Sequence, residues 1–210
     1  MDIEYKGANS VVISTKKAKI IVDPKLSIVG LNDVSTKDCI QLATEERFAT
    51  NNENAVVNIE GPGEYELSDF AIRGIPVRRH IDTPDSPKLS TIYRVEASGI
   101  RLGVVGNITP KLHDEQQESL GVLDLLIVPI GGNGYTLDAT SAATLARTLD
   151  VKVVIPVHYN DVAIKYEVAQ DELDVFVKEF GAEVLETTKY KLKSAANIPI
   201  TPTIIAISRS

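Results

Sequence analysis

Polar side chains follow several apolar segments of this chain, at the point where each predicted strand ends. Asp23 comes directly after KIIV, Asn107 after RLGVVG and His158 after VVIPV. His80 follows IRGIPVRR, and the polar residues 44–50 follow a further short strand. Carboxylate and imidazole groups bind metal ions or transfer protons. Because ligands of α/β proteins gather beyond the carboxyl ends of strands, we expect these residues to border one cleft.

Histidine is scarce, with only His80, His113 and His158 in 210 residues. Considered alone, a strand-end histidine such as His158 more often hydrogen-bonds to neighbouring backbone than binds a ligand. His80 lies in the basic segment VRRH, which is typical of a solvated turn. His113 precedes DEQQ and is expected at the surface, at the start of a helix, without a functional role.

Other kinds of site find little support. The glycine-rich residues 131–134 could present backbone N–H groups to an anion, but a flexible strand-to-helix connection is the preferred interpretation. They are not a P-loop, because no Gly-Lys-Ser/Thr follows. The chain has no Gly-x-Ser-x-Gly nucleophile motif. Cys39 stands inside an apolar run, which is typical of an inert, packed thiol.

Composition limits the classes of protein that the chain can represent. Hydrophobic residues make up 43% and charged residues 24%, which is ordinary for a globular protein. The net charge of −7 disfavours binding to nucleic acid. The sequence shows neither a signal peptide nor an apolar run long enough to span a membrane. A single cysteine excludes an internal disulfide, so the cytoplasm is the expected location.

Strand signals dominate the first half of the chain. ANSVVIST and AKIIVDP are β-branched runs that predict a hairpin, and the proline after Asp23 should end the second run. A loop with a short helix and the segment DCIQLA follow. AVVNIEGPGEYELSDFAIRGIPVRRH predicts three short strands separated by turns. TPDSP, residues 83–87, predicts a junction near residues 83–90 between two β-rich halves of one domain that spans residues 1–210.

The second half adds helices to a similar beginning. STIYRVEAS and IRLGVVGN predict a hairpin, and LDLLIVPI and VKVVIPVHYN predict strands that are buried on both faces. Helices are predicted in HDEQQESLG, in ATSAATLARTLD with Asp138 as its N-cap, and in AQDELDVFVKEFG. Two or three β segments follow Val184. This order predicts an α/β fold in which sheets pack face to face with helices outside, a four-layer αββα sandwich.

Four segments together resemble the metallo-β-lactamase superfamily, and more narrowly its zinc-dependent hydrolases similar to L-ascorbate-6-phosphate lactonase. They are IEYKGANSVVIST…KIIVDP, GPGEYELSDFAIRGIPV, IYRVEASGIRLGVVGNI and LDLLIVPIGGNGYTLDATSAATLARTLDVKVVIPVHYN. The last is the most specific, since it runs from an Asp-x-Leu strand through Gly-Gly to Pro-x-His-Tyr. The resemblance covers almost the whole chain. It implies an αββα sandwich with a metal site at the edge between its two sheets.

The resemblance also assigns positions to the metal ligands. The family usually holds its metals with a His-x-His-x-Asp-His loop, a later histidine, an aspartate that bridges two metals and a final histidine. On this chain the final histidine matches His158, the later histidine falls at His80, and the bridging aspartate falls at Asn107. The loop falls on residues 45–50, whose sequence is EERFAT and contains no histidine. The histidine that often follows the family's first glycine is replaced by Ala8.

These substitutions change what the site can bind. A catalytic zinc usually needs three protein ligands and one open position, and this set keeps two imidazoles at most. Asn107 is neutral where a carboxylate would balance two divalent ions. Arg47 brings a permanent positive charge to the place of a metal ligand. Glu45 is expected to pair with Arg47 or to face solvent.

We therefore expect a protein of this fold that has no metal cofactor and lacks the family's usual hydrolytic activity. Arg47, with His80 and His158 nearby, would then hold an anionic small molecule where the metal would lie. We call the family motif positions the residual cleft: Asp23, Glu45, Arg47, His80, Asn107 and His158.

Two alternatives remain open at this stage. One is an active hydrolase of phosphoesters or lactones, in which His80, His158 and either Asp23 or Glu45 hold one zinc or another divalent metal. The other is a scaffold that presents the sandwich surface to a protein partner.

Overall fold

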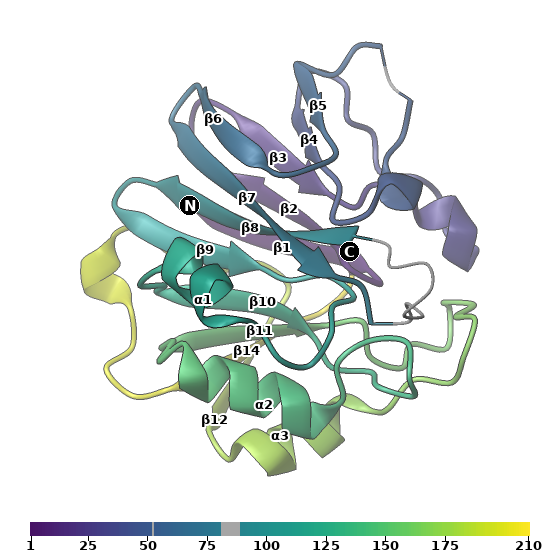
Figure 1. The fold of residues 1–210 in the computed structure, drawn as a ribbon, viewed down its shortest axis with the longest axis vertical. Helices are drawn as coiled ribbons and strands as arrows, with labels where there is room; N and C mark the ends of the chain where they lie inside the picture. The colour runs from purple at the N-terminus through teal and green to yellow at the C-terminus, as the bar shows by residue number, and fades with distance from the viewer. Residues whose placement is uncertain (52, 81–88) are drawn as a thin grey trace.

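Two β-sheets pack face to face at the centre of the molecule (Figure 1). The computed structural model describes residues 1–51, 53–80 and 89–210. One sheet has six strands in the order β13-β1-β2-β3-β4-β5, and the other has eight in the order β12-β14-β11-β10-β9-β8-β7-β6. The predicted junction at residues 83–90 falls mostly outside the described residues.

The strand bounds follow the apolar segments of the sequence. The six-stranded sheet consists of β1 (Asp2–Gly7), β2 (Ser10–Ser14), β3 (Lys19–Val22), β4 (Ile40–Leu42), β5 (Val57–Ile59) and β13 (Tyr190–Lys191). The eight-stranded sheet consists of β6 (Gly63–Leu67), β7 (Phe70–Arg78), β8 (Leu89–Ala97), β9 (Ile100–Val104), β10 (Leu125–Pro129), β11 (Val153–Val157), β12 (Glu183–Thr187) and β14 (Thr203–Ile207).

Both predicted hairpins are present, since β2 pairs antiparallel with β3 and β8 with β9. The three strands predicted between residues 55 and 80 are β5, β6 and β7. The buried runs form β10 and β11, which pair in parallel. The strand β1 was not predicted separately, although its buried and partly exposed residues alternate as they do in a half-buried strand.

Three α-helices, α1 (Asp114–Leu120), α2 (Ala139–Thr148) and α3 (Leu173–Phe180), confirm the predicted helical segments. As predicted, Asp138 caps α2, because its Oδ1 accepts a hydrogen bond from the Ser141 N–H at 2.7 Å. His113 lies at the N-cap of α1, also as predicted. The glycines Gly121 and Gly181 end α1 and α3.

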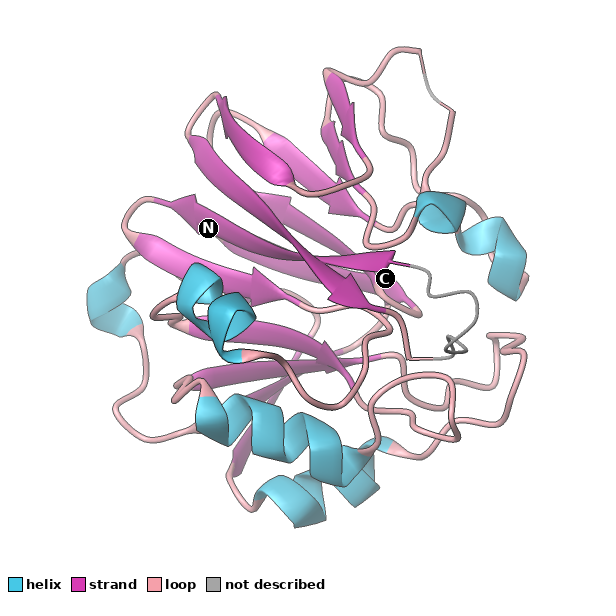
Figure 2. Ribbon diagram, viewed as in Figure 1, coloured by secondary structure: helices cyan, strands magenta, loops and turns pink. Residues whose placement is uncertain are grey.

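The helices lie outside the eight-stranded sheet (Figure 2). In the described part of the chain, the loops after β3 and β4 carry the 3₁₀ turns η1 (Leu26–Val29) and η2 (Glu46–Phe48), and a third turn, η3 (Ala195–Asn197), precedes β14. The predicted α/β fold with two packed sheets is confirmed. None of the helices in the described ranges combines the length and apolar character needed to cross a bilayer.

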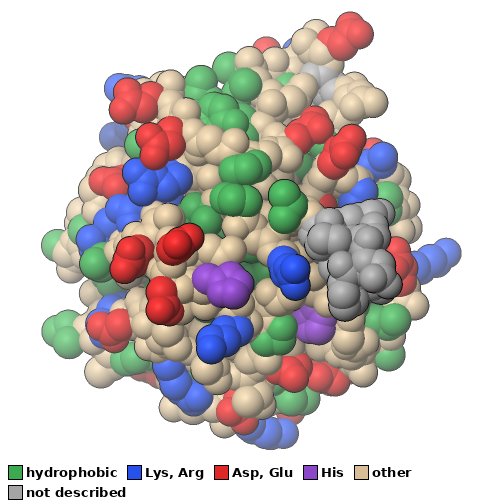
Figure 3. Space-filling model, viewed as in Figure 1, with side chains coloured by type: hydrophobic (Ala, Val, Ile, Leu, Met, Phe, Trp, Pro, Cys, Tyr) green, Lys and Arg blue, Asp and Glu red, His purple; other side chains and the backbone are tan. Residues whose placement is uncertain are grey.

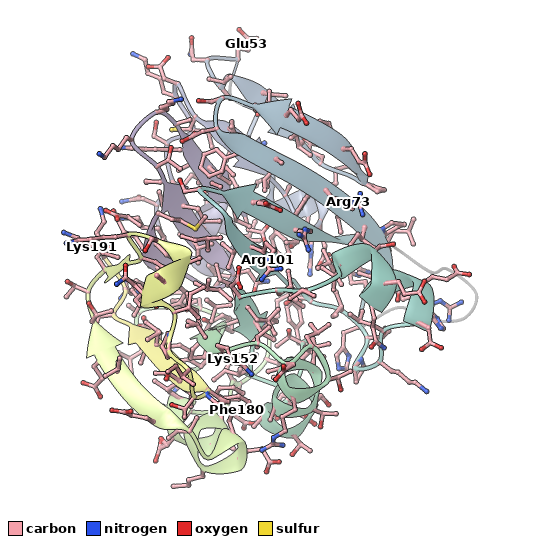
Figure 4. All side chains as sticks on the ribbon, turned by 90° about the vertical axis from the view of Figure 1, so that its left-hand side faces the viewer. Glu53, Arg73, Arg101, Lys152, Phe180 and Lys191 are labelled. Atoms are coloured by element: carbon pink, nitrogen blue, oxygen red, sulfur yellow. The ribbon has the colours of Figure 1, made fainter. Side chains whose placement is uncertain are left out.

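Alternation along the buried strands creates two cores. Ile127 of β10 faces the six-stranded sheet and packs with residues such as Ile13 and Ile20. Its neighbours Leu126 and Val128 face the opposite way, toward the helices. Side chains fill the space between the layers (Figure 4). This double burial fixes the ends of β9, β10 and β11, where the candidate site lies.

Candidate functional site at the edge of the two sheets

The loops that follow β3, β4, β9 and β11 meet at one edge of the sandwich. Thr44, two residues after β4, joins the two sheets because its carbonyl accepts hydrogen bonds from the Ser90 hydroxyl at 3.0 Å and the Thr91 N–H at 2.8 Å. Gly106 permits this approach, since a Cβ there would lie 2.6 Å from the Thr44 side chain. The His158 N–H donates to the Ala8 carbonyl at 2.9 Å. The edge is therefore built by contacts between the sheets.

Backbone strain gathers at this edge. Ala8, Asp23 and His158 have φ values of 47°, 45° and 53°, in the left-handed region that residues with a Cβ rarely adopt. Such strain persists only where surrounding contacts enforce it, and it is common at functional sites. The conformation turns the chain sharply after each of the strands β1, β3 and β11.

Asp23 is buried and accepts two short hydrogen bonds from one residue. The Thr44 N–H and hydroxyl donate to its two carboxyl oxygens, each at 2.7 Å. Burial raises the pKa of Asp23 to about 7, although the bonds from Thr44 oppose the shift. Near neutral pH, Asp23 therefore exists in both the protonated and the ionised form.

Glu45 is also buried, and three side chains donate to it. Its Oε2 accepts from Arg47 Nε at 2.8 Å and from Arg79 Nη1 at 3.2 Å. Its Oε1 accepts from Asn107 Nδ2 at 3.4 Å. The predicted pairing of Glu45 with Arg47 is confirmed, and Arg79 is an addition that the sequence did not suggest. We call Glu45, Arg47 and Arg79 the Glu45 clamp.

The Arg47 guanidinium extends from the Glu45 clamp toward the aromatic side chains of the cleft. Its Cζ lies 4.6 Å from the centre of the Phe48 ring and 5.4 Å from that of Tyr135. One of its nitrogens lies 3.8 Å from a Glu167 oxygen. About one third of the side chain is exposed. Arg47 is thus a partly exposed cation held by two carboxylates and two ring faces.

His158 is buried between two tyrosine rings. Its ring centre lies 5.6 Å from that of Tyr135 and 4.7 Å from that of Tyr166. Its Nδ1 lies 3.0 Å from Gln170 Oε1. Burial lowers the pKa of His158 to about 4, although the bond to Gln170 opposes the shift. The imidazole is therefore neutral at physiological pH.

Gln170 fixes which nitrogen of His158 carries the proton. The Gln170 Nε2 donates to the carbonyls of Val168 and Ala169, at 2.9 and 3.2 Å, so its Oε1 faces the imidazole. That oxygen can only accept, and Nδ1 must therefore donate. The Nε2 atom of His158 is left with a lone pair. Gly131 makes room for this arrangement, because a Cβ there would collide with Gln170 Oε1 and the His158 carbonyl.

Asn107 contacts His80 through the backbone and Asn9 through its side chain. The His80 N–H donates to the Asn107 carbonyl at 3.1 Å, and the Asn107 Oδ1 accepts from Asn9 Nδ2 at 3.0 Å. Glu45 thus contacts both Arg47 and Asn107 directly. His80 joins this group through its backbone and is partly buried.

A pocket opens between η1, η2 and His158, and we call it the His158 pocket. Asn9, Asp23 and His158 are its polar residues from the strand ends. The cavity measures about 20 Å³, which is the room that one water-sized group needs. The remaining lining residues are mainly apolar or aromatic, with two charged side chains and a glutamine: Ala8, Lys25, Leu26, Ile28, Val29, Phe48, Tyr135, Tyr166, Glu167 and Gln170.

Among the residues that the structure describes, metal-ligating side chains do not form a cluster at this edge. Within residues 1–51, 53–80 and 89–210, no three side chains of His, Cys, Asp or Glu converge in a way that could hold an ion. Asp23, Glu45 and His158 are each buried and each hydrogen-bonded to neighbouring protein groups.

A second groove crosses the outer face of β6 to β9, beside α1. Arg73 and Arg101 project there from β7 and β9 (Figure 4). Each is paired, Arg73 with Glu64 at 2.9 Å and Arg101 with Asp124 at 2.7 Å. Acidic and basic side chains lie next to one another on the face that carries α1 (Figure 3). Because Arg73 and Arg101 are neutralised by neighbouring carboxylates in surface ion pairs, their charges do not indicate a functional site in this groove.

A family model described as the beta-lactamase superfamily domain matches residues 2–158, which include all six positions of the residual cleft. The chain belongs to the metallo-β-lactamase superfamily. The match ends at His158, the position assigned to the family's final histidine. No curated protein matches the chain.

Solved structures show the same superfamily fold. A Thermotoga maritima protein named as a Zn-dependent hydrolase of the metallo-β-lactamase superfamily has 20% identity and a TM-score of 0.78, with 100% of this chain and 99% of that one covered. A metallo hydrolase from Ignicoccus hospitalis has 15% identity and a TM-score of 0.65, with 99% and 94% covered. CmlA, a diiron β-hydroxylase from Streptomyces venezuelae, has 14% identity and a TM-score of 0.60, with 86% and 51% covered. At these identities the likeness shows the fold alone.

Sequence reasoning missed several members of the site. Arg79 lies 34 residues from Glu45, and Gln170 lies 12 residues beyond His158 in an irregular segment. Asn9 follows Gly7 and Ala8, where the resemblance drew attention only to a missing histidine. The glycine pair at 131–132 was a usable signal, because a glycine after a buried strand often marks a close approach.

Proposed function

We propose that this chain is a metallo-β-lactamase-fold protein that does not carry out the metal-dependent hydrolysis of its family and binds a small molecule in the residual cleft. The Glu45 clamp is the observation that carries the proposal. Two guanidinium groups lie on Glu45, the buried carboxylate of the segment that the resemblance assigns to the metal-binding loop, at 2.8 and 3.2 Å. A divalent ion there would have to displace both of them, or share Glu45 with two cations.

The other residues also fit a metal poorly. Asn107 offers an amide in place of a bridging carboxylate and uses its Nδ2 toward Glu45. Asp23 accepts both hydrogen bonds from Thr44, and burial raises its pKa to about 7, which disfavours the ionised form that a metal would need. His158 could offer Nε2, and His80 is the other imidazole of the residual cleft, but no third side chain of His, Cys, Asp or Glu converges with them among the described residues. The donor set does not fit a catalytic zinc, which needs three ligands with an open fourth position.

Without a metal the usual hydrolytic route has no starting point. Family hydrolysis depends on a metal-bound water whose pKa falls to about 7. His158 has a pKa of about 4 and so is a weak base. Asp23 has a pKa of about 7, but Thr44 donates to both of its carboxyl oxygens. The cleft can still bind, since it combines aromatic walls with a few placed polar groups.

The ligand is expected to carry an anionic group, as the sequence also suggested. Lys25 lines the His158 pocket, and the Arg47 guanidinium lies 5.4 Å from the ring of Tyr135, which also lines it. His158 does not add to these two cations, because burial keeps it neutral. An anion would therefore be held by Arg47 and Lys25, and not at the imidazole.

An activity screen tests the proposal. Bis-p-nitrophenyl phosphate and a γ-lactone would be offered to the protein with added Zn²⁺, Mn²⁺ or Fe²⁺. We expect no turnover above that of the free metal ions. Turnover that is lost in both His80→Ala and His158→Ala would overturn the proposal in favour of a rearranged mononuclear hydrolase.

A further inference from the structure

We infer that the floor of the His158 pocket binds a neutral hydrogen-bond donor of the ligand, a hydroxyl or a carboxamide N–H, through the side-chain oxygen of Asn9. This inference deepens the proposed function and rests on it, since a metal at this edge would take the same acceptors. It says which chemical group of the ligand lies against Asn9, whereas the cations Arg47 and Lys25 indicate only that another part of the ligand is anionic.

A chain of hydrogen bonds fixes the orientation of Asn9. Glu45 can only accept, so the atom of Asn107 that faces it at 3.4 Å must be the donor Nδ2. The other end of that amide, Oδ1, then faces Asn9 and accepts from its Nδ2 at 3.0 Å. The oxygen of Asn9 is consequently the atom that points away from Asn107. Glu45 thus determines which way the side-chain amides of Asn107 and Asn9 are oriented.

That oxygen is a buried atom of the pocket that has no hydrogen-bond partner among the described residues. Asn9 is 4% exposed and lines the cavity. Across the described residues, no donor lies within hydrogen-bond distance of its Oδ1. A buried amide oxygen without a donor costs free energy, so such atoms normally meet water or a ligand. Asn9 therefore indicates a ligand that brings a donor.

His158 reinforces the same preference. Because Gln170 Oε1 accepts from Nδ1, the Nε2 atom of the neutral imidazole carries a lone pair. Asn9 Oδ1 and His158 Nε2 thus both offer a lone pair to a hydrogen-bond donor of the ligand. A carboxylate or phosphate at this place would be repelled, because its oxygens, Asn9 Oδ1 and His158 Nε2 are all hydrogen-bond acceptors.

The dimensions limit the donor to a small group. A cavity of about 20 Å³ accepts a hydroxyl or an amide nitrogen but no larger branched group. Ile28, Phe48, Tyr135 and Tyr166 line the pocket with apolar and aromatic surface. The geometry suits a flat or aliphatic body that lies against these side chains with one donor directed inward.

Three small probes test the inference on the full-length protein. Benzamide and benzyl alcohol carry a donor on an aromatic ring, and benzoate has the same shape as benzamide but no donor. Binding would be followed by NMR, with the side-chain amide signal of Asn9 as the local reporter. We expect saturable shifts of that signal with benzamide and benzyl alcohol, and binding of benzoate weaker by about tenfold.

Variants locate the binding. Asn9→Leu removes the oxygen at similar volume, and we expect benzamide to bind about tenfold more weakly. Thr136→Val is the matched control, since the Thr136 hydroxyl is also buried without a partner among the described residues but does not line the pocket. Because Asn9→Leu also removes a donor to Asn107, its folded state is checked by circular dichroism. If it unfolds, the reporter signal in the wild-type protein decides.

The outcomes separate this inference from the proposed function. Equal affinities of benzoate and benzamide measured by the Asn9 signal, or no shift of that signal with any probe, overturn the inference. Metal content is measured on the same samples. If the protein is metal-free and binds none of the probes, the inference alone is overturned. If it carries about one metal ion per chain, the proposed function is overturned as well.

Discussion

Arg47 Nε lies 2.8 Å from Glu45 Oε2, and Glu45 is almost completely buried. Arg79 Nη1 approaches the same oxygen at 3.2 Å. By the resemblance, Glu45 and Arg47 stand where the superfamily's metal-binding loop would carry its first two histidines, so Arg47 brings a permanent positive charge there. This ion pair in place of metal ligands is the reason why we expect the site to bind no metal.

Removal of the Glu45 charge should destabilise the fold. Glu45→Gln leaves two guanidinium groups near each other without their shared counter-ion, and about 2 kcal/mol of unfolding free energy should be lost, less than for a fully buried pair because Arg47 is partly exposed. Urea denaturation measures the change. Glu46→Gln is the matched control, since Glu46 is exposed, and equal effects of the two changes would contradict the role assigned to Glu45.

The pH dependence of stability should contain two opposite contributions. The pKa of His158 falls from 6.5 to about 4 on folding, so its contribution is present above pH 6.5 and is lost as the pH falls toward 4. The pKa of Asp23 rises from 3.8 to about 7, so its contribution is present below pH 3.8 and is lost as the pH rises toward 7. Between pH 4 and 6.5 the two largely cancel.

Single variants should reveal each contribution. Asp23→Asn leaves that of His158, so stability should increase from pH 4 to 6.5 with a slope of up to about 1.4 kcal/mol per pH unit. His158→Gln leaves that of Asp23, so stability should decrease over the same interval. Denaturation at several pH values measures both slopes, and slopes of the same sign in the two variants would show that one of these shifts is wrong.

Gln170 should control the protonation of His158. A carboxylate in place of the Gln170 amide would stabilise the imidazolium, so Gln170→Glu should raise the pKa of His158 from about 4 by more than about one unit. NMR titration of the histidine ring signals measures this shift. His113, at the start of α1, serves as an internal control. An unchanged titration of His158 would contradict the contact with Gln170.

Much of the fold was predictable because its signals are local. Apolar runs gave β10 and β11, Asp138 gave the start of α2, and the Asp23-Pro24 step gave the end of β3. The pairing of Glu45 with Arg47 was predictable for the same reason, since the two residues lie two positions apart.

The partners that complete the site were not predictable in this way. Arg79 reaches Glu45 only because β7 ends at the edge where β4 ends, and that adjacency depends on how the two sheets pack. Gln170 reaches His158 through an irregular loop, and Asn9 acquires its orientation from Asn107 and Glu45. Such contacts depend on tertiary topology, which composition and periodicity do not encode.

The metal content of the purified protein tests the central claim most directly. The protein would be expressed with zinc, manganese and iron in the medium, purified without chelators, and analysed by inductively coupled plasma mass spectrometry beside His158→Ala. The Glu45 clamp predicts far less than one ion per chain, with no difference between the two proteins. Near-stoichiometric metal in the wild type that disappears in His158→Ala would contradict it.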